Sequence, residues 1–141
     1  MAVSTADAVW EGSLKEGKGT VKTGSGAING AYSFGSRFES GTGSNPEELL
    51  AAAEAACFSM ALAGALERAG TPSTKIETKA ACTVEKQDAG FGITTMKLTV
   101  RASVPGVDKA AFQKAVQDTK TGCPVSKALT GVKIDVEAQL V

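Results

Sequence analysis

The sequence contains no histidine. This absence excludes the imidazole base of Ser-His-Asp and Cys-His catalytic sites, as well as histidine-ligated haem and the common zinc sites. Three cysteines are present, Cys57, Cys82 and Cys123, but no CxxC pair occurs, which removes thioredoxin-like motifs and structural zinc sites. We therefore expect no metal and no cofactor. Any thiol chemistry must be assisted by arginine, lysine, glutamate or the end of a helix.

Aromatic residues are also scarce, and the net charge is zero. Aromatic residues make up 5% of the 141 residues, and 15 basic residues are balanced by 15 acidic ones. Binding to nucleic acid without sequence preference needs a basic face, and single-strand binding needs aromatic stacking platforms. We therefore expect no nucleic-acid partner.

No targeting segment is evident. The opening residues MAVSTADAVWEGSL contain neither a basic region nor an apolar run, so no secretory signal is predicted. The most apolar stretch, residues 49–66, is interrupted by Glu54 and is too rich in alanine to predict a membrane span. An odd number of cysteines without a signal peptide also argues against a disulfide framework. These features predict a cytoplasmic protein with no membrane partner.

The length predicts one domain, residues 1–141. Glycines recur throughout residues 7–39 and favour turns, and three short strands are expected around residues 9–15, 19–24 and 31–38. The following residues predict a helix, with Asn45 as N-cap, Pro46 at the first position and Glu48 completing a capping box. It should run to about Arg68 and stop at Gly70. Because it is apolar nearly all round, we expect it to be buried.

The second half alternates apolar and polar residues over 74–86 and 93–104, which predicts a β-hairpin with its turn at residues 88–92. Asp108 should cap a helix that ends near Gly122. A short helix should start at Pro124, and residues 132–141 alternate as a last strand. The order is βββ-α-ββ-αα-β, an α+β domain.

The three thiols differ in their surroundings. Cys82 lies on the apolar side of its predicted strand, which favours a structural role. Cys123 precedes Pro124 and so occupies an N-cap, where free N–H groups favour a thiolate, although a small loop residue explains the position equally well. Cys57 is in mid-helix, and Glu54 on the same face would raise its pKa if buried nearby. Local sequence therefore favours Cys57 as a packing residue, unless the fold brings a cation to it.

Three arginines could supply that cation. Arg68 lies eleven residues further along the helix, roughly 16 Å by helical rise, which is too distant. Arg37 and Arg101 are both expected on strands that could reach the helix, and a lysine remains open. Arginine is favoured because it keeps its charge when buried and can bind a carboxylate at the same time.

The stretch NPEELLAAAEAACFSMAL, followed by GCPVSKAL and preceded by FGSRFESGTGSNPEE, resembles the OsmC/Ohr family of osmotically induced and organic hydroperoxide resistance proteins. The resemblance implies an OsmC-like fold, a central helix wrapped by sheets that are completed in an intertwined homodimer. It also implies a thiol-dependent peroxidase with Cys57 as peroxidatic cysteine and Cys123 as resolving cysteine. Arg37 and Glu47 would complete the site.

The residues agree with the resemblance in two respects and depart from it in one. Arg37 is one of the two candidate cations, and Glu48, assigned to the capping box, leaves Glu47 free to hold an arginine. The plainer explanations are compensation of the helix dipole by Glu47 and an ordinary surface position for Arg37. The departure is Glu54, because the family often has His or Tyr at that position.

The resemblance further implies an organic hydroperoxide substrate and an external dithiol reductant, either a lipoyl protein or a thioredoxin-like protein. An organic hydroperoxide is also favoured by three apolar residues beside Cys57, namely Phe58, Met60 and Leu62, unless they are core residues. The sequence CFSMAL favours the OsmC branch of the family. A non-enzymatic stress-induced binding protein of the same fold and a thiol-disulfide reductase are the alternatives. A homodimer is also expected because strands this short would otherwise leave open sheet edges.

Overall fold

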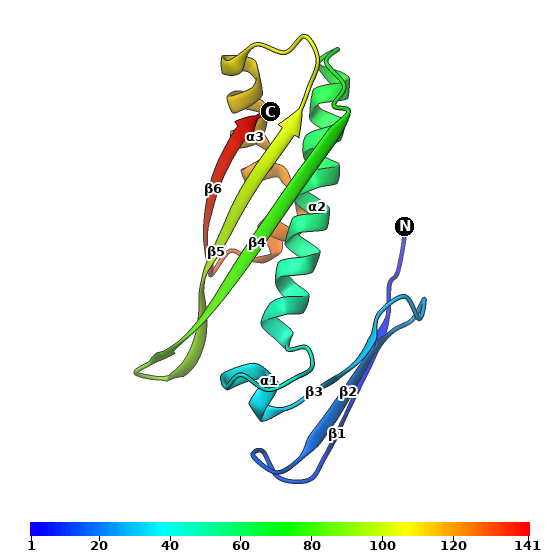
Figure 1. Ribbon diagram of the computed structural model, residues 1–141, viewed down its shortest axis with the longest axis vertical. Coiled ribbons are helices and arrows are strands. Elements are labelled where there is room, and N and C mark those ends of the chain that lie inside the picture. The colour runs from blue at the N-terminus through cyan, green and yellow to red at the C-terminus, as the bar shows by residue number, and fades with distance from the viewer. The chain divides into compact units, whose positions relative to one another are not determined.

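The computed structural model describes residues 1–141, which form two compact units, Met1–Leu49 and Leu50–Val141. Figure 1 shows the elements along the chain. In chain order they are β1 (Ala6–Glu11), β2 (Lys18–Thr23), β3 (Asn29–Tyr32), α1 (Phe34–Phe38), α2 (Pro46–Arg68), β4 (Lys75–Gln87), β5 (Gly90–Ser103), α3 (Lys109–Gly122), α4 (Pro124–Ala128) and β6 (Lys133–Leu140). The predicted α+β class is confirmed, with one helix more than expected.

The first unit contains an antiparallel sheet with the strand order β1-β2-β3. The rings of Trp10 and Tyr32 pack over Gly19 with their centroids 5.5 Å apart. A Cβ atom at Gly19 would come within 2.5 Å of the Tyr32 ring, so this position requires glycine. Both Val9 and Ile28 remain exposed, at 55% and 45%. This sheet therefore leaves apolar side chains in contact with solvent.

The third predicted strand is partly wrong, because β3 ends at Tyr32 and residues 34–38 form α1. Two serines explain the change. The Ser33 side chain accepts a hydrogen bond from the Ser36 N–H at 3.0 Å, and the Ser36 hydroxyl accepts one from the Ser33 N–H at 2.8 Å. This reciprocal capping box begins a helix directly after the strand. Arg37 consequently lies on a helix and not on a strand. The first strand also lies earlier than predicted, at Ala6–Glu11.

Helix α2 has the predicted ends. Asn45 Oδ1 accepts a hydrogen bond from the Glu48 N–H at 2.8 Å, which satisfies one of the free donors of the first turn. Gly70 has a φ of +83° and ends the helix, and the Thr71 N–H bonds back to the Leu66 carbonyl at 3.0 Å.

The sides of α2 differ in burial. Phe58, Leu62 and Leu66 are buried, whereas Met60 is 78% exposed. The expectation that α2 would be buried all round is therefore not met in the single chain. By length and composition α2 could also cross a membrane, a test that core helices of soluble proteins pass as well.

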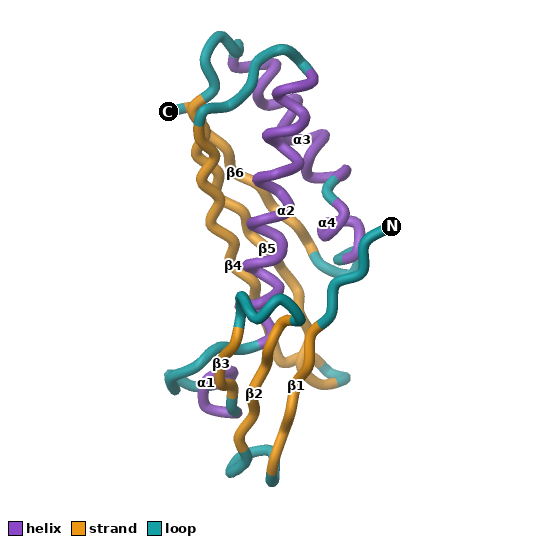
Figure 2. The backbone as a smooth tube through the Cα atoms, turned by 90° about the vertical axis from the view of Figure 1, so that its right-hand side faces the viewer, coloured by secondary structure: helices purple, strands orange, loops and turns teal.

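The second unit is built on a sheet with the order β4-β5-β6, in which β4 and β5 are antiparallel and β5 and β6 are parallel. Helices α2 and α3 cover one face of this sheet (Figure 2). The core between them is formed by Phe58, Leu62, Leu66, Met96, Leu98, Val100, Ala102, Val104, Phe112 and Val116. The predicted hairpin and the predicted cap of α3 are confirmed, the latter by a 2.8 Å bond from the Ala111 N–H to Asp108 Oδ1.

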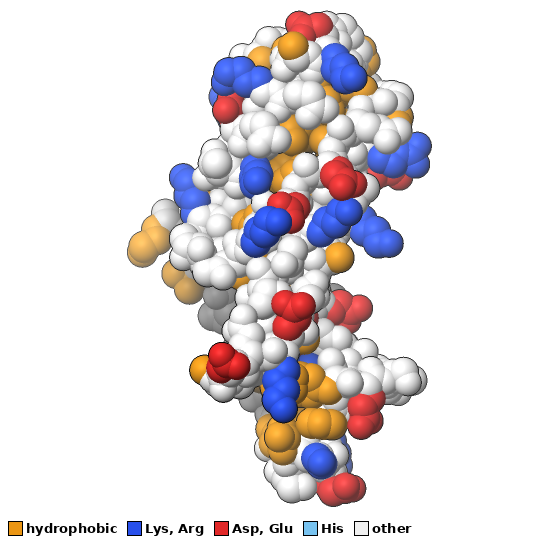
Figure 3. Space-filling model, turned by 90° about the vertical axis from the view of Figure 1, so that its left-hand side faces the viewer, with side chains coloured by type: hydrophobic (Ala, Val, Ile, Leu, Met, Phe, Trp, Pro, Cys, Tyr) orange, Lys and Arg blue, Asp and Glu red, His pale blue; other side chains and the backbone are white.

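The opposite face of this sheet is polar. Ion pairs join Lys75 to Glu77 and Lys97 to Glu137, at 2.9 and 3.2 Å. In Figure 3 basic and acidic side chains are interspersed over the visible side of the molecule. The face therefore has mixed charge.

Candidate active site

Two cysteines meet in the second unit. Cys57 lies on α2, and Cys123 lies at the junction where α3 ends and α4 begins. The Cys123 N–H bonds to the Thr119 carbonyl at 2.9 Å, and Pro124 then starts α4, so the chain turns sharply at Cys123. The Cys123 thiol donates to Cys57 Sγ at 2.7 Å, and both thiols are free. Since a disulfide bond measures about 2.05 Å, a small movement would join them.

The surroundings of Cys57 favour its thiol form. Burial raises the pKa of Cys57 above its ordinary value of 9.0, and the hydrogen bond with Cys123 adds to this effect. The negative charge of Glu54 acts in the same direction, as its sequence position predicts, while a backbone hydrogen bond from Val125 opposes it. No cation is among the groups that shift this pKa. An active thiolate at Cys57 thus needs a positive charge from elsewhere.

Glu54 itself is fully buried beside this pair. The Ser126 hydroxyl, from α4, donates to Glu54 Oε1 at 2.5 Å. The second carboxyl oxygen, Oε2, is buried and has no hydrogen-bond partner. The contact between Glu54 and Ser126 spans 72 residues of sequence, and no local pattern could have predicted it.

An ion pair forms a second group of functional candidates, in the first unit. Arg37 Nη2 lies 2.7 Å from Glu47 Oε1, and Arg37 Nε lies 3.1 and 3.2 Å from the two oxygens of Glu47. Glu47 is buried, with 5% of the residue exposed. Glu48 accepts a hydrogen bond from the Ser44 hydroxyl at 2.6 Å, so it does not compete for the arginine. This two-point geometry holds the guanidinium in one orientation.

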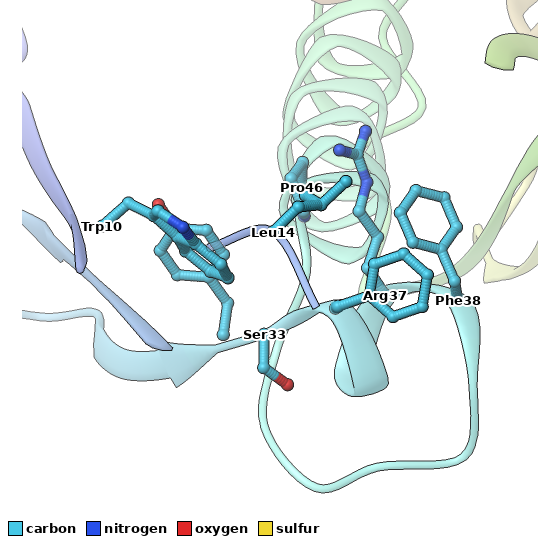
Figure 4. A pocket seen from close by; sticks show the side chains of 8 residues that line it. Trp10, Leu14, Ser33, Arg37, Phe38 and Pro46 are labelled. Atoms are coloured by element: carbon cyan, nitrogen blue, oxygen red, sulfur yellow. The ribbon is translucent and has the colours of Figure 1, made fainter. Parts of the chain in front are cut away.

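Arg37 also borders a pocket of about 230 Å³. Figure 4 shows several of its lining side chains from close by. The pocket is lined by Trp10, Leu14, Tyr32, Ser33, Phe34, Arg37, Phe38 and Pro46. Four of these eight residues are aromatic, so few polar partners are available to a ligand apart from the arginine. Sequence reasoning missed this pocket, because its aromatic residues are spread over β1, β3 and α1.

Two other expectations about the site are corrected. Phe58 and Leu62 are buried in the core of the second unit and Met60 is exposed, so these three residues do not surround the thiol as a substrate pocket. Arg101 is exposed, between the buried Val100 and Ala102 of β5. It therefore projects from the sheet face opposite the core, on which α2 does not pack.

Comparison with known proteins gives consistent matches. The sequence profile of the family described as OsmC-like protein matches residues 39–137. The chain is 49% identical over 132 residues to a protein of Escherichia coli (strain K12) named peroxiredoxin OsmC, with 93% of this chain and 92% of that protein covered. It is 36% identical over 102 residues to an organic hydroperoxide resistance protein of Xanthomonas axonopodis pv. citri, with 71% and 68% covered.

Solved structures agree with these sequence matches. The crystal structure of the organic hydroperoxide resistance protein OhrB of Bacillus subtilis superposes with a TM-score of 0.76 at 26% identity, covering 96% of this chain and 98% of that chain. A structure of an organic hydroperoxide resistance protein from Elizabethkingia anophelis gives a TM-score of 0.77 at 24% identity, with 99% of each chain covered, which shows the shared fold.

Proposed function

The chain belongs to the OsmC-like protein family, and we propose from this that it is a cysteine-based peroxidase that reduces organic hydroperoxides to alcohols. The observation that carries the proposal is the 2.7 Å separation of Cys57 Sγ and Cys123 Sγ. Two free thiols at this distance can store the two electrons that a hydroperoxide takes up. A protein that only bound ligands would have no need of such a pair.

The reaction has three steps. The Cys57 thiolate attacks the distal oxygen of the hydroperoxide, the O–O bond breaks, and an alcohol leaves after its alkoxide gains a proton. Cys57 is then a sulfenic acid, and the Cys123 sulfur attacks it to form a disulfide with loss of water. An external dithiol, of a lipoyl protein or a thioredoxin-like protein, reduces the disulfide by thiol exchange. Because Cys123 is already in contact, it captures the sulfenic acid before a second peroxide can oxidise it further.

Arg37 and Glu47 supply the missing charge in this proposal. The Arg37 guanidinium favours the Cys57 thiolate, and Glu47 orients it. Ten residues of α2 separate Glu47 from Cys57, a rise of about 15 Å. By the measure that excludes Arg68, Glu47 itself is too distant along α2 to contact Cys57 of the same chain. We therefore propose a homodimer in which the ion pair of one chain serves the thiol of the other.

The surface supports such a dimer. Val9, Ile28, Met60 and Phe91 are apolar and exposed. Both three-stranded sheets have outer strands with unpaired edges, which proteins normally cover. The intertwined arrangement expected for the family would cover these edges and side chains by pairing the strands of one chain with those of the other.

The substrate and the compartment follow from the same residues. The aromatic pocket beside Arg37 has the apolar lining that an organic group needs, which favours organic hydroperoxides over hydrogen peroxide. None of the three cysteines forms a disulfide, which fits a reducing compartment, so we place the protein in the cytoplasm.

The test is oxidation by one equivalent of cumene hydroperoxide, followed by peptide mapping. We expect a disulfide between Cys57 and Cys123 within one chain, with Cys82 still in its thiol form, and alcohol formed in equal amount. Cys82→Ser should behave identically. A link between Cys57 and Cys82 would show that the resolving thiol is misassigned. No alcohol at all would favour the binding-protein alternative.

A further inference from the structure

Peroxide reduction needs a proton that the two thiols do not provide. Cys57 reacts as a thiolate and brings no proton, while cleavage of the O–O bond produces an alkoxide, a strong base. The Cys123 proton is required in the next step, where it leaves with the sulfenic oxygen as water. A separate acid beside Cys57 would therefore speed the first step.

Glu54 is positioned to be that acid. It precedes Cys57 by three residues on α2, so the two side chains lie on one face of the helix. The first turn of α4 packs on this face, where Cys123 contacts Cys57 and Ser126 contacts Glu54. The Ser126 hydroxyl occupies Oε1 and leaves Oε2 buried and without a partner. Oε2 therefore has no existing hydrogen bond that would compete with proton exchange, and Glu54 is close enough to Cys57 for its charge to raise the pKa of the thiol.

Cys57 and Glu54 are electrostatically linked, because a negative Glu54 raises the pKa of the Cys57 thiol. The titratable groups of the cluster are Cys57, Cys123 and Glu54, and none of the ion pairs in the structure includes Glu54. Two adjacent buried negative charges would repel each other and lose their hydration, which is costly. One negative charge is tolerated more easily than two. A single shared proton can lie on the Cys57 thiol or on the Glu54 carboxylate, and the first step uses the second arrangement, a thiolate with a carboxylic acid.

We propose that Glu54 is the general acid of peroxide reduction, giving its Oε2 proton to the alkoxide as the O–O bond breaks. This proposal rests on the proposed function. In the first step Cys57 thiolate, hydroperoxide and Glu54 carboxylic acid become Cys57 sulfenic acid, alcohol and Glu54 carboxylate. In the second step the Cys123 proton leaves with the sulfenic oxygen as water. When an external dithiol then reduces the disulfide, it delivers two protons, one of which stays on Cys123 and the other returns to Glu54.

The test compares Glu54→Gln with the wild type in single-turnover oxidation of Cys57, using two peroxides with different leaving groups. tert-Butyl hydroperoxide releases a basic alkoxide that needs a proton, whereas peroxybenzoic acid releases benzoate, which needs none. Glutamine keeps the size of the side chain and can still accept from Ser126. We expect Glu54→Gln to lose about 100-fold or more with tert-butyl hydroperoxide, and to stay within about twofold of the wild type with peroxybenzoic acid.

Each other outcome overturns the proposal. An equal loss with both peroxides would assign Glu54 a packing role, and an equal gain would show a charged Glu54 that only repels the thiolate. Alkylation of Cys57 by iodoacetamide, measured in parallel, corrects the rates for any change in thiolate population. Glu48→Gln, an exposed position on the same helix, is the matched control and should change neither rate. If the wild type reacts with neither peroxide, the proposed function itself fails, which is a different result.

Discussion

In the proposed mechanism the charge of Cys57 depends on Arg37, since the chain has no histidine. Arg37→Met keeps the aliphatic stem and removes the charge, so loss of this proposed cation should raise the pKa of the Cys57 thiol. At neutral pH the thiolate population, and with it the peroxide rate, should fall about tenfold or more. The measurement is the rate of Cys57 alkylation against pH, in a Cys82→Ser, Cys123→Ser background.

The matched control for this experiment is Arg101→Met, which removes an exposed arginine from the far face of the β4-β5-β6 sheet and should leave the alkylation curve in place. Glu47→Gln should move the curve less than Arg37→Met, since it orients the arginine without touching sulfur. If Arg101→Met moves the curve and Arg37→Met does not, the assignment of the arginine is wrong.

In the proposed mechanism Cys123 protects Cys57, because the two sulfurs are already in contact. In Cys123→Ser the first turnover should survive at a rate close to that of the wild type, since Cys57 alone attacks the peroxide. The sulfenic acid then has no partner thiol and should accumulate, and further peroxide should convert it to sulfinic acid. Intact mass after graded peroxide addition measures both products. Cys82→Ser should show neither, and sulfinic acid forming equally in both variants would contradict the resolving role.

Much of the residue-level chemistry could be predicted from local sequence. The position of Cys123 before Pro124 and the effect of Glu54 on the pKa of Cys57 depend on residues within a turn of one another, and both are found. The contact of Ser126 with Glu54 depends on how α4 packs against α2. A contact between segments that are distant in the sequence cannot be predicted from the residue spacing within either segment.

Asn45 joins two elements, because its side chain does more than cap α2. Its Oδ1 accepts from the Glu48 N–H, and its Nδ2 donates to the Ser36 carbonyl of α1 at 3.0 Å. Asn45→Ala should lower the free energy of unfolding by about 1 to 2 kcal/mol, through loss of the cap and of this second bond. Urea denaturation at one fixed protein concentration measures this, since the stability of an oligomer depends on concentration.

Asp108→Ala is the control for the capping part alone, because Asp108 caps α3 through a single bond to the Ala111 N–H. It should cost about 1 kcal/mol. Asn45→Asp, which keeps the acceptor and loses the donor, should fall between the wild type and Asn45→Ala. If Asn45→Asp proves as stable as the wild type, the bond to Ser36 contributes nothing.

The elements that the sequence predicts well are those with strong local signals. Alternation over the β4–β5 hairpin, the caps at Asn45 and Asp108, and the stop at Gly70 fixed those boundaries to within a few residues. Helix α1 escaped prediction because its five residues contain too little helical periodicity, and only the serine pair marks its start. In the glycine-rich segment before it, the pairing of strands and not the local sequence decides where each strand begins.

At the level of the whole chain, the single domain and the homodimer remain predictions, and they are linked. The main core lies in the second unit, while the first unit is a small sheet with exposed apolar side chains. A sheet of three strands needs a hydrophobic face, or packing against a helix, to be stable on its own, and here apolar side chains of the first unit remain exposed. Sedimentation should therefore show a dimer at micromolar concentration, and a stable monomer would count against both the dimer and the division of the active site between two chains.

The division of the site can be tested by mixing an inactive protein with a strongly impaired one. Cys57→Ser lacks the nucleophile and keeps the ion pair, whereas Arg37→Met keeps both thiols and lacks the cation. A mixed dimer would contain one complete site, formed by Arg37 and Glu47 of the first chain with Cys57 and Cys123 of the second. Co-refolding of equal amounts should restore about a quarter of wild-type activity, because half of the random dimers are mixed and each has one of two sites intact. A matched mixture of Cys57→Ser with a Cys57→Ser, Arg37→Met double variant should restore none. If the first mixture also restores none while sedimentation shows mixed dimers, the arginine must serve the thiol of its own chain.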